Sequence, residues 1–204
     1  MECILPVAAW HALDAMYSVV LQKDVYQYSV PLTHGIVTTV SSLYYLWTRH
    51  NQFTWTTLKM SRGYFMYDMF HVCRTRQYLY VTHHSLLILF LSFFQRFQLE
   101  NMFMKSLLLG EITNPLLQLR CMTKNIPKYR HLFPVVNHAF TWLFAVVRGI
   151  CIPYYCNAFL RDISKDDRVS KKTYRTIAAC TVLFNLGNLV WLRGLLRGYW
   201  KWIK

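Results

Sequence analysis

The sequence predicts an all-α fold, a multi-pass transmembrane bundle of about six to seven helices. Of its 204 residues, 54% are hydrophobic and 16% are charged, whereas roughly a quarter of the residues in a soluble domain are charged. Apolar stretches recur along the whole chain, and each approaches or reaches the ~20 residues that a helix needs to cross a bilayer. Two of them, LLILFLSFF and AFTWLFAVV, are apolar on every face, unlike the amphipathic helices of soluble proteins.

Seven segments are expected to form helices, in the order 3–22, 29–47, 58–73, 79–97, 102–121, 132–159 and 176–193. The third is the weakest, since it is short and carries Arg62 and Asp68. Pro115 lies inside the fifth segment, where it removes a backbone donor and loosens the preceding turn. The other prolines considered are expected near segment ends or in connections: Pro31, Pro127, Pro134 and Pro153.

The first segment is interpreted as a membrane helix and not as a cleaved signal, because it lacks a basic n-region and contains Asp14. No repeat, low-complexity tract or long linker divides the chain, so one domain is expected. The six cysteines form no CxxC motif. We therefore predict no metal or redox site and expect each cysteine to pack in the core.

The net charge of +14 comes from Lys and Arg between the apolar segments. Basic residues in such positions are typical of contacts with lipid headgroups. No nucleic-acid-binding module is visible, so we expect no nucleic-acid partner. The connections on the two sides of the membrane contain equal numbers of Lys and Arg, so the positive-inside rule does not decide the orientation. The connection at 120–131 and the tail from 193 contain no acidic residue, which favours a cytosolic C-terminus.

His83 and His84 open the apolar run HHSLLILF. On a helix the two side chains are about 100° apart, so at most one points squarely inward. Ionisable groups at membrane depth cost ~2.5–3.5 kcal/mol each and invite a functional hypothesis. Imidazole can act as a base, nucleophile or metal ligand. The alternative is that one histidine anchors the helix end while the other bonds to a neighbouring helix.

Glu111 and Asn114 are three residues apart in GEITNPLLQLR, hence on one helix face. A carboxylate buried next to a histidine can orient it and raise its basicity. Alternatively, Glu111 pairs with Arg148 or His138 and holds helices together.

Asp68 is placed for a headgroup contact or a salt bridge to Arg74, and Arg148 for a phosphate or an acidic partner. Interhelical hydrogen bonds are expected from Asn137, His138, Asn185 and Asn188. The tail with Tyr199, Trp200 and Trp202 is interpreted as an interfacial anchor.

Taken in order, several of these stretches resemble the TLC-domain family of ceramide-synthase-related membrane proteins. They are YFMYD at 64–68, HHSLLILF at 83–90, GEITNPLLQLR at 110–120, an arginine-glycine-aromatic helix at 148–155 and NLVWLRGLLRG at 188–198. The resemblance assigns residues 29–198 to the TLC domain, residues 1–28 to a first membrane helix with its connection, and residues 199–204 to a basic aromatic tail.

The resemblance implies a helical barrel around a lipid-sized cavity in the endoplasmic reticulum or a related membrane. In ceramide synthases the histidine pair moves a fatty acyl group from acyl-CoA to a sphingoid amine. Those enzymes carry paired acidic residues on a following helix, but the matching helix here has only Glu111. The pattern is similar to the small, non-synthase TLC proteins, whose roles concern lipid composition, sensing or trafficking.

Two functions therefore stay open. The first is binding or sensing of membrane lipids in an intramembrane cavity, as part of lipid homeostasis, with Asp68, Asn114 and Arg148 as lipid-binding residues. The second is an acyl-CoA-dependent lipid acyltransferase with His83, His84 and Glu111 as catalytic residues and acyl-CoA as co-substrate. A small-solute transporter is disfavoured, since the chain has no internal repeat.

Overall fold

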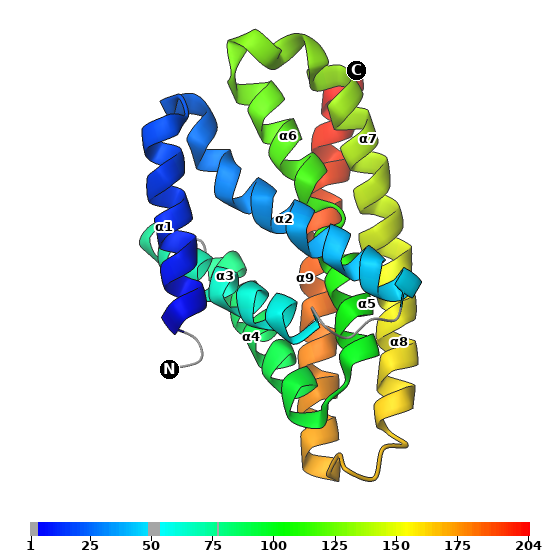
Figure 1. The fold of residues 1–204 in the computed structure, drawn as a ribbon. Helices are drawn as coiled ribbons and strands as arrows, with labels where there is room; N and C mark the ends of the chain where they lie inside the picture. Colours follow the sequence, from blue (N-terminus) through cyan, green and yellow to red (C-terminus); the bar gives the residue numbers. More distant parts are fainter. Residues whose placement is uncertain (1–3, 49–53, 77) are drawn as a thin grey trace.

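The structure, a computed structural model, describes residues 4–48, 54–76 and 78–204. These residues contain no β-strand, which confirms the all-α fold class. The helices are α1 (Ile4–Val20), α2 (Lys23–Thr48), α3 (Thr54–Arg74), α4 (Tyr78–Phe97), α5 (Glu100–Glu111), α6 (Asn114–Asn125), α7 (Phe133–Val146), α8 (Ile152–Ile163) and α9 (Lys171–Ile203) (Figure 1).

Two of the predicted segments, 102–121 and 132–159, are each divided into two helices. Ile112 and Thr113 form a turn between α5 and α6, and α6 restarts with Pro115 in its first turn, where the missing N–H has no cost. A π-helical turn, Val147–Cys151, joins α7 to α8. Counted with these interruptions, the helices match the seven predicted segments.

Most of the prolines are placed as expected, at the first turns of helices. Pro31 is the exception, because α2 begins at Lys23, earlier than the predicted start, and Pro31 therefore lies inside the helix. The expectation that it marks a segment end is wrong. The predicted span 29–47 included only the apolar part of a longer helix.

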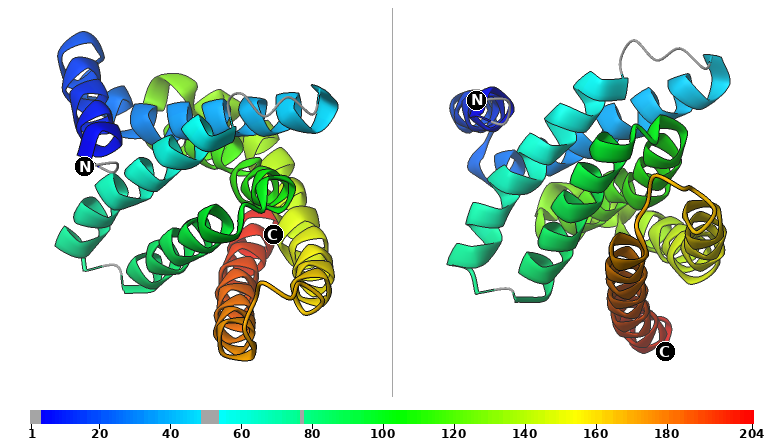
Figure 2. Two further views of the ribbon diagram at one scale, coloured as in Figure 1. Left: turned by 60° about the horizontal axis from the view of Figure 1, so that its bottom comes forward. Right: turned by 90° about the horizontal axis from the view of Figure 1, so that it is seen from below.

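The bundle has two distinguishable ends (Figure 1). The C-terminus lies at the same end as the α1–α2 and α6–α7 connections, and the α4–α5 and α8–α9 connections lie at the opposite end. Helix α1 lies at the edge of the bundle, away from α8 and α9, in both views of Figure 2. The acid-free connection and the acid-free tail thus lie together at one end.

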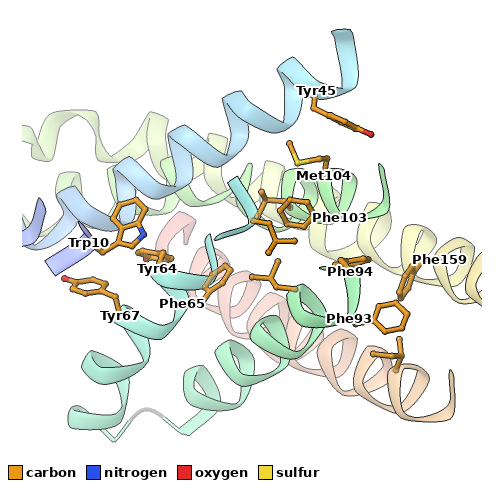
Figure 3. Close-up of a cluster of buried hydrophobic side chains, with 14 of the residues drawn as sticks. Trp10, Tyr45, Tyr64, Phe65, Tyr67, Phe93, Phe94, Phe103, Met104 and Phe159 are labelled. Atoms are coloured by element: carbon orange, nitrogen blue, oxygen red, sulfur yellow. The ribbon is translucent and has the colours of Figure 1, made fainter. Parts of the chain in front are cut away.

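An aromatic core holds the helices together (Figure 3). Phe93, Phe94 and Phe159 pack where α4 meets α8, and Phe103 of α5 adjoins them. At the other side of the bundle Trp10 lies on Tyr64, with ring centroids 5.4 Å apart. This core fixes the positions of α3, α4 and α5, which carry most of the predicted site residues.

The outer surface is apolar. Trp47 is 87% exposed and Val19 85% exposed, and many other large apolar side chains share this surface. Among the described residues, the stretches Pro127–Ile163 and Lys171–Ile203 are long and apolar enough to cross a membrane by length and composition, and each contains an 18-residue segment with a mean hydropathy of 1.6 and 1.4, respectively. An apolar surface of this extent is typical of a chain that faces lipid.

The cysteines depart from the sequence-based expectation. Those described are free thiols: Cys73 is exposed, and Cys121, Cys151, Cys156 and Cys180 are partly exposed. The prediction that each packs in the core is therefore wrong for Cys73, since a small apolar thiol can also face hydrocarbon, whereas the other four are partly buried. Cys3 lies outside the described residues.

Two glycines permit close helix contacts. A Cβ added to Gly35 of α2 would lie 3.1 Å from the Cβ of Asn114 and from the Cδ of Pro115. A Cβ added to Gly63 of α3 would lie 2.5 Å from the Cβ of Pro6 in α1. Helix α2 therefore packs closely against the α5–α6 break, and α1 packs closely against α3.

Candidate functional site

The two adjacent histidines of α4 have different neighbours. His84 is buried, and its Nε2 lies 3.2 Å from Oδ2 of Asp68 in α3. His83 is partly exposed and stacks on Phe184 of α9, with ring centroids 5.4 Å apart. The edge of Trp191 also meets the His83 ring. As the helical spacing predicts, only one histidine points squarely into the bundle, and the predicted salt bridge from Asp68 to Arg74 is replaced by the contact with His84.

Glu111 is the last residue of α5 and is buried. Its Oε2 lies 3.3 Å from Nδ1 of His34 in α2 and accepts a hydrogen bond from Nδ2 of Asn114 at 2.7 Å. The expected pairing of Glu111 with the adjacent histidine pair is therefore wrong. The nearest imidazole comes from α2 because Gly35 lets that helix approach the α5–α6 break.

His34 is completely buried, and its ring stacks on Tyr64 with centroids 3.7 Å apart. The sequence-based reasoning did not single it out. The signal that selected Glu111, an ionisable side chain within an apolar segment, is also present at His34 and could have identified it. Nothing in the sequence, however, indicates that it faces Glu111.

Arg148 connects the two interrupted spans. It lies in the π-helical turn, where its Nη1 donates to Oδ1 of Asn188 at 2.9 Å and its Nη2 donates to the carbonyl oxygen of Gly110. The same Nη2 lies 3.5 Å from Oγ1 of Thr113. Both terminal nitrogens thus hold the α5–α6 break to α7–α8 and α9. The expected pairing of Arg148 with Glu111 is replaced by these contacts.

The other predicted interhelical bonds are also present. Asn137 accepts a hydrogen bond from Nε of Arg120 at 2.7 Å, and His138 bonds to the Tyr199 hydroxyl. Asn185 donates its Nδ2 to the Thr181 carbonyl of its own helix and also bonds to the Cys156 side chain of α8. The tail is a continuation of α9, and Tyr199 ties it to α7.

A polar cavity of about 390 Å³ brings the predicted site residues together. All six of them line it: Asp68, His83, His84, Glu111, Asn114 and Arg148. Its wall also includes Arg120 and Trp191, which the sequence-based reasoning did not select for the site. A volume of this size is within the range of small-molecule sites.

An apolar crevice of about 70 Å³ adjoins the polar cavity. Its wall is mainly aromatic and aliphatic, with Leu87, Phe94 and Phe103 among its residues. Phe65 and Glu111 line both spaces. The described residues contain no group of three His, Cys, Asp or Glu side chains that could hold a metal ion.

Comparison with known proteins identifies the family. A family model of the TLC domain matches residues 24–197, which include nearly all of α2 to α9. Neither the search of curated proteins nor the search of solved structures gives a match. Helix α1 precedes the matched region. The chain therefore belongs to the TLC-domain family of membrane proteins.

Proposed function

We propose that this protein binds a membrane lipid inside its bundle and acts in membrane lipid metabolism or homeostasis. The observation that carries the proposal is the polar cavity joined to the apolar crevice, with Phe65 and Glu111 in both walls. A lipid has the same division, since one end is polar and the other is apolar.

The polar cavity suits a headgroup that both donates and accepts hydrogen bonds. Asp68 and Glu111 offer carboxylate oxygens, while Arg120, His83 and His84 offer nitrogens. The crevice offers apolar contacts to the first part of an acyl chain.

Native mass spectrometry of the purified full chain tests this proposal. We expect a lipid to remain bound to the wild type and to be lost in Leu87→Trp, because the larger side chain fills the crevice. Leu89→Trp is the matched control, since Leu89 is on the same helix and 41% exposed but does not line the crevice. Equal lipid occupancy in both variants would contradict the proposal.

Acyl transfer is the second candidate, and the contact between His84 and Asp68 favours it. In this scheme an imidazole nitrogen attacks the thioester carbonyl of acyl-CoA, the C–S bond breaks, and coenzyme A leaves as the thiol after taking up a proton. A lipid amine or hydroxyl then attacks the acyl-imidazole and gives its proton to the released nitrogen. Asp68 would orient the ring and stabilise its cationic form.

Comparative lipidomics separates the two candidates. Cells would express the wild type, His83→Ala, His84→Ala, Asp68→Asn and Glu111→Gln at matched levels of folded protein. Acyl transfer predicts a lipid class that rises with the wild type and reverts in His84→Ala and Asp68→Asn. The same lipid change in all five lines would instead make these side chains dispensable and favour binding without chemistry.

We also propose an endoplasmic-reticulum location with a cytosolic C-terminus. The basic, acid-free connection at 120–131 and the basic, acid-free tail lie at one end of the bundle, which suits contact with the anionic cytosolic leaflet. Glycosylation acceptor sites inserted after Lys204 and, separately, into the 164–170 connection test this orientation. We expect modification only in the 164–170 connection, and modification at the C-terminus would reverse the assignment.

A further inference from the structure

Arg120 lines the polar cavity from α6, on the side of the cavity that lies toward the C-terminal end of the bundle. Helix α6 runs from the break after Glu111 to the connection with α7, and this connection lies at the same end as the C-terminus (Figure 1). Arg120 is in the middle of α6, whereas Glu111 precedes the helix and borders the apolar crevice. The polar cavity therefore extends from the crevice to Arg120 in the direction of the C-terminal end.

The guanidinium group of Arg120 is held in place by α7. Its Nε donates a hydrogen bond of 2.7 Å to Oδ1 of Asn137, which is buried. Its Cζ lies 5.5 Å from the ring centroid of Phe140 and 5.9 Å from that of Phe133. Because Phe140 also lines the polar cavity, the charged end of Arg120 lies at the cavity wall together with its aliphatic stem.

The two terminal nitrogens of Arg120 have no hydrogen-bond or ion-pair partner in the part of the chain that the structure describes. The two carboxylates that line the cavity, Asp68 and Glu111, are each in contact with a buried histidine instead. Charged side chains inside membrane proteins usually pair with another charged group. Arg120 thus brings a positive charge to the cavity that the described residues do not compensate.

Arg148, the residue that the sequence suggests for a phosphate, is less suited to this task. It is 5% exposed, and its two terminal nitrogens already donate hydrogen bonds to Asn188 and Gly110. In Arg120, which is partly exposed, Nε makes the contact within the protein and the terminal pair can donate to two oxygens of one anion. Arginine binds phosphate groups by such paired hydrogen bonds.

Helix α9 leaves its side of the cavity open. Gly194 and Gly198 line the cavity and are exposed. A Cβ added at either glycine would meet no atom of the described residues within 4 Å. A headgroup could therefore enter the cavity past these two glycines. Arg197, which precedes Gly198 and is exposed, adds positive charge beside this entrance.

We propose that Arg120 binds the phosphate group of the lipid ligand, with its two terminal nitrogens donating to two phosphate oxygens. The proposal rests on the lipid binding proposed for the polar cavity and narrows the ligand to a lipid that carries a phosphate. The uncompensated charge, the position of Arg120 toward one end of the bundle and the open side at α9 together select this class of ligand. A membrane phospholipid and a long-chain acyl-CoA share this chemistry.

Photolabelling of the full chain in detergent micelles tests the proposal. Three probes carry the same diazirine-bearing acyl chain: a phosphatidic acid, an acyl-CoA and, as the probe without a phosphate, a diacylglycerol. We expect at least one phosphate-bearing probe to label the wild type about tenfold more strongly than the diacylglycerol, because hydrogen bonds between charged groups are stronger than neutral ones. Preferential labelling by phosphatidic acid would identify a phospholipid as the source of the phosphate, and preferential labelling by acyl-CoA would identify the thioester.

Two variants of α6 show whether the labelling depends on Arg120. Arg120→Gln should lower the labelling by the phosphate-bearing probe to the level of the diacylglycerol. Lys124→Gln is the matched control, because Lys124 is the basic residue one turn further along α6, is exposed and does not line the cavity. Its labelling should stay close to that of the wild type.

Asn137→Asp tests the same site without removing Arg120. The new carboxylate would accept the hydrogen bond from Nε and would supply a counter-charge from within the protein. Labelling by the phosphate-bearing probe should fall as in Arg120→Gln, while the unfolding temperature should stay close to that of the wild type. This variant therefore separates a loss of binding from a loss of folding, and Asn137 is a positioning residue in this scheme.

Three results would overturn the proposal. They are labelling by the diacylglycerol as strong as that by both phosphate-bearing probes, equal losses in Arg120→Gln and Lys124→Gln, and no labelling by either phosphate-bearing probe.

Leu87→Trp, which fills the crevice, separates this proposal from the function proposed for the cavity. Labelling that is lost in Leu87→Trp but retained in Arg120→Gln would overturn the phosphate site and leave lipid binding in place. Labelling that is lost in Arg120→Gln but retained in Leu87→Trp would support the phosphate site and contradict the crevice as the place of the acyl chain.

Discussion

Glu111 and His34 lie 3.3 Å apart, measured from Oε2 to Nδ1, and both side chains are buried. The contact joins the end of α5 to the middle of α2 at the point where the α5–α6 span is interrupted. Glu111, which the sequence offers to His83 or His84 as a catalytic partner, therefore faces a third histidine. Asp68 takes the corresponding place beside His84.

The coupling between Glu111 and His34 can be measured in a double-mutant cycle. His34→Phe and Glu111→Gln should each destabilise the fold, because removing one partner of a buried contact leaves the other unsatisfied, at a cost of about 1–3 kcal/mol. The double variant should be more stable than the sum of the single effects predicts. Thermal unfolding in detergent measures the stability of each variant. Strictly additive effects would show that the contact between the two side chains contributes no coupling free energy.

The close packing at Gly35 predicts a position-specific glycine effect. Gly35→Val should destabilise the bundle by about 1–3 kcal/mol, since the added atoms meet Asn114 and Pro115. Gly187→Ala is the control, because an added Cβ there meets nothing within 4 Å and α9 should gain about 0.4–1 kcal/mol. Unfolding temperatures of the two variants should therefore move in opposite directions, and a shared direction would contradict the packing.

We expect Arg148 to stabilise the fold by holding the α5–α6 break to α9. Arg148→Lys should lower the free energy of unfolding by about 1.5–3 kcal/mol, because an ammonium cannot reproduce the two hydrogen bonds to Asn188 and Gly110. Arg168→Lys is the comparison, since Arg168 bonds to Asp166 in an exposed connection. Denaturation of both variants in parallel checks this, and equal stabilities would contradict this role.

The two adjacent histidines should respond differently to the same substitution. His83→Phe keeps the stacking on Phe184 and the edge contact with Trp191, so stability should change by less than about 0.5 kcal/mol. His84→Phe leaves Asp68 without its partner and should cost about 1–3 kcal/mol. Chemical unfolding followed by tryptophan fluorescence checks the contrast. Two equally destabilised variants would mean that His83 also makes a polar contact that the fold needs.

The sequence by itself determined the fold class, the order of the seven spans and the approximate place of the break before Pro115. These features follow from apolar length and from the missing N–H of proline, which are local along the chain. It also selected six residues that line one cavity, because an ionisable group inside an apolar segment needs a polar surrounding wherever that segment packs.

Only the tertiary structure decided which of these groups meet. Helical periodicity fixes the face on which a side chain lies, but it does not fix the helix that this face contacts. The pairing of Glu111 with His34 depends on the close approach that Gly35 allows, and the role of Arg148 depends on a π-helical turn. The packing of α1 on α3 depends on the close contact of Pro6 with Gly63. Such contacts join residues far apart in sequence, so local hydrophobicity and spacing could not specify them.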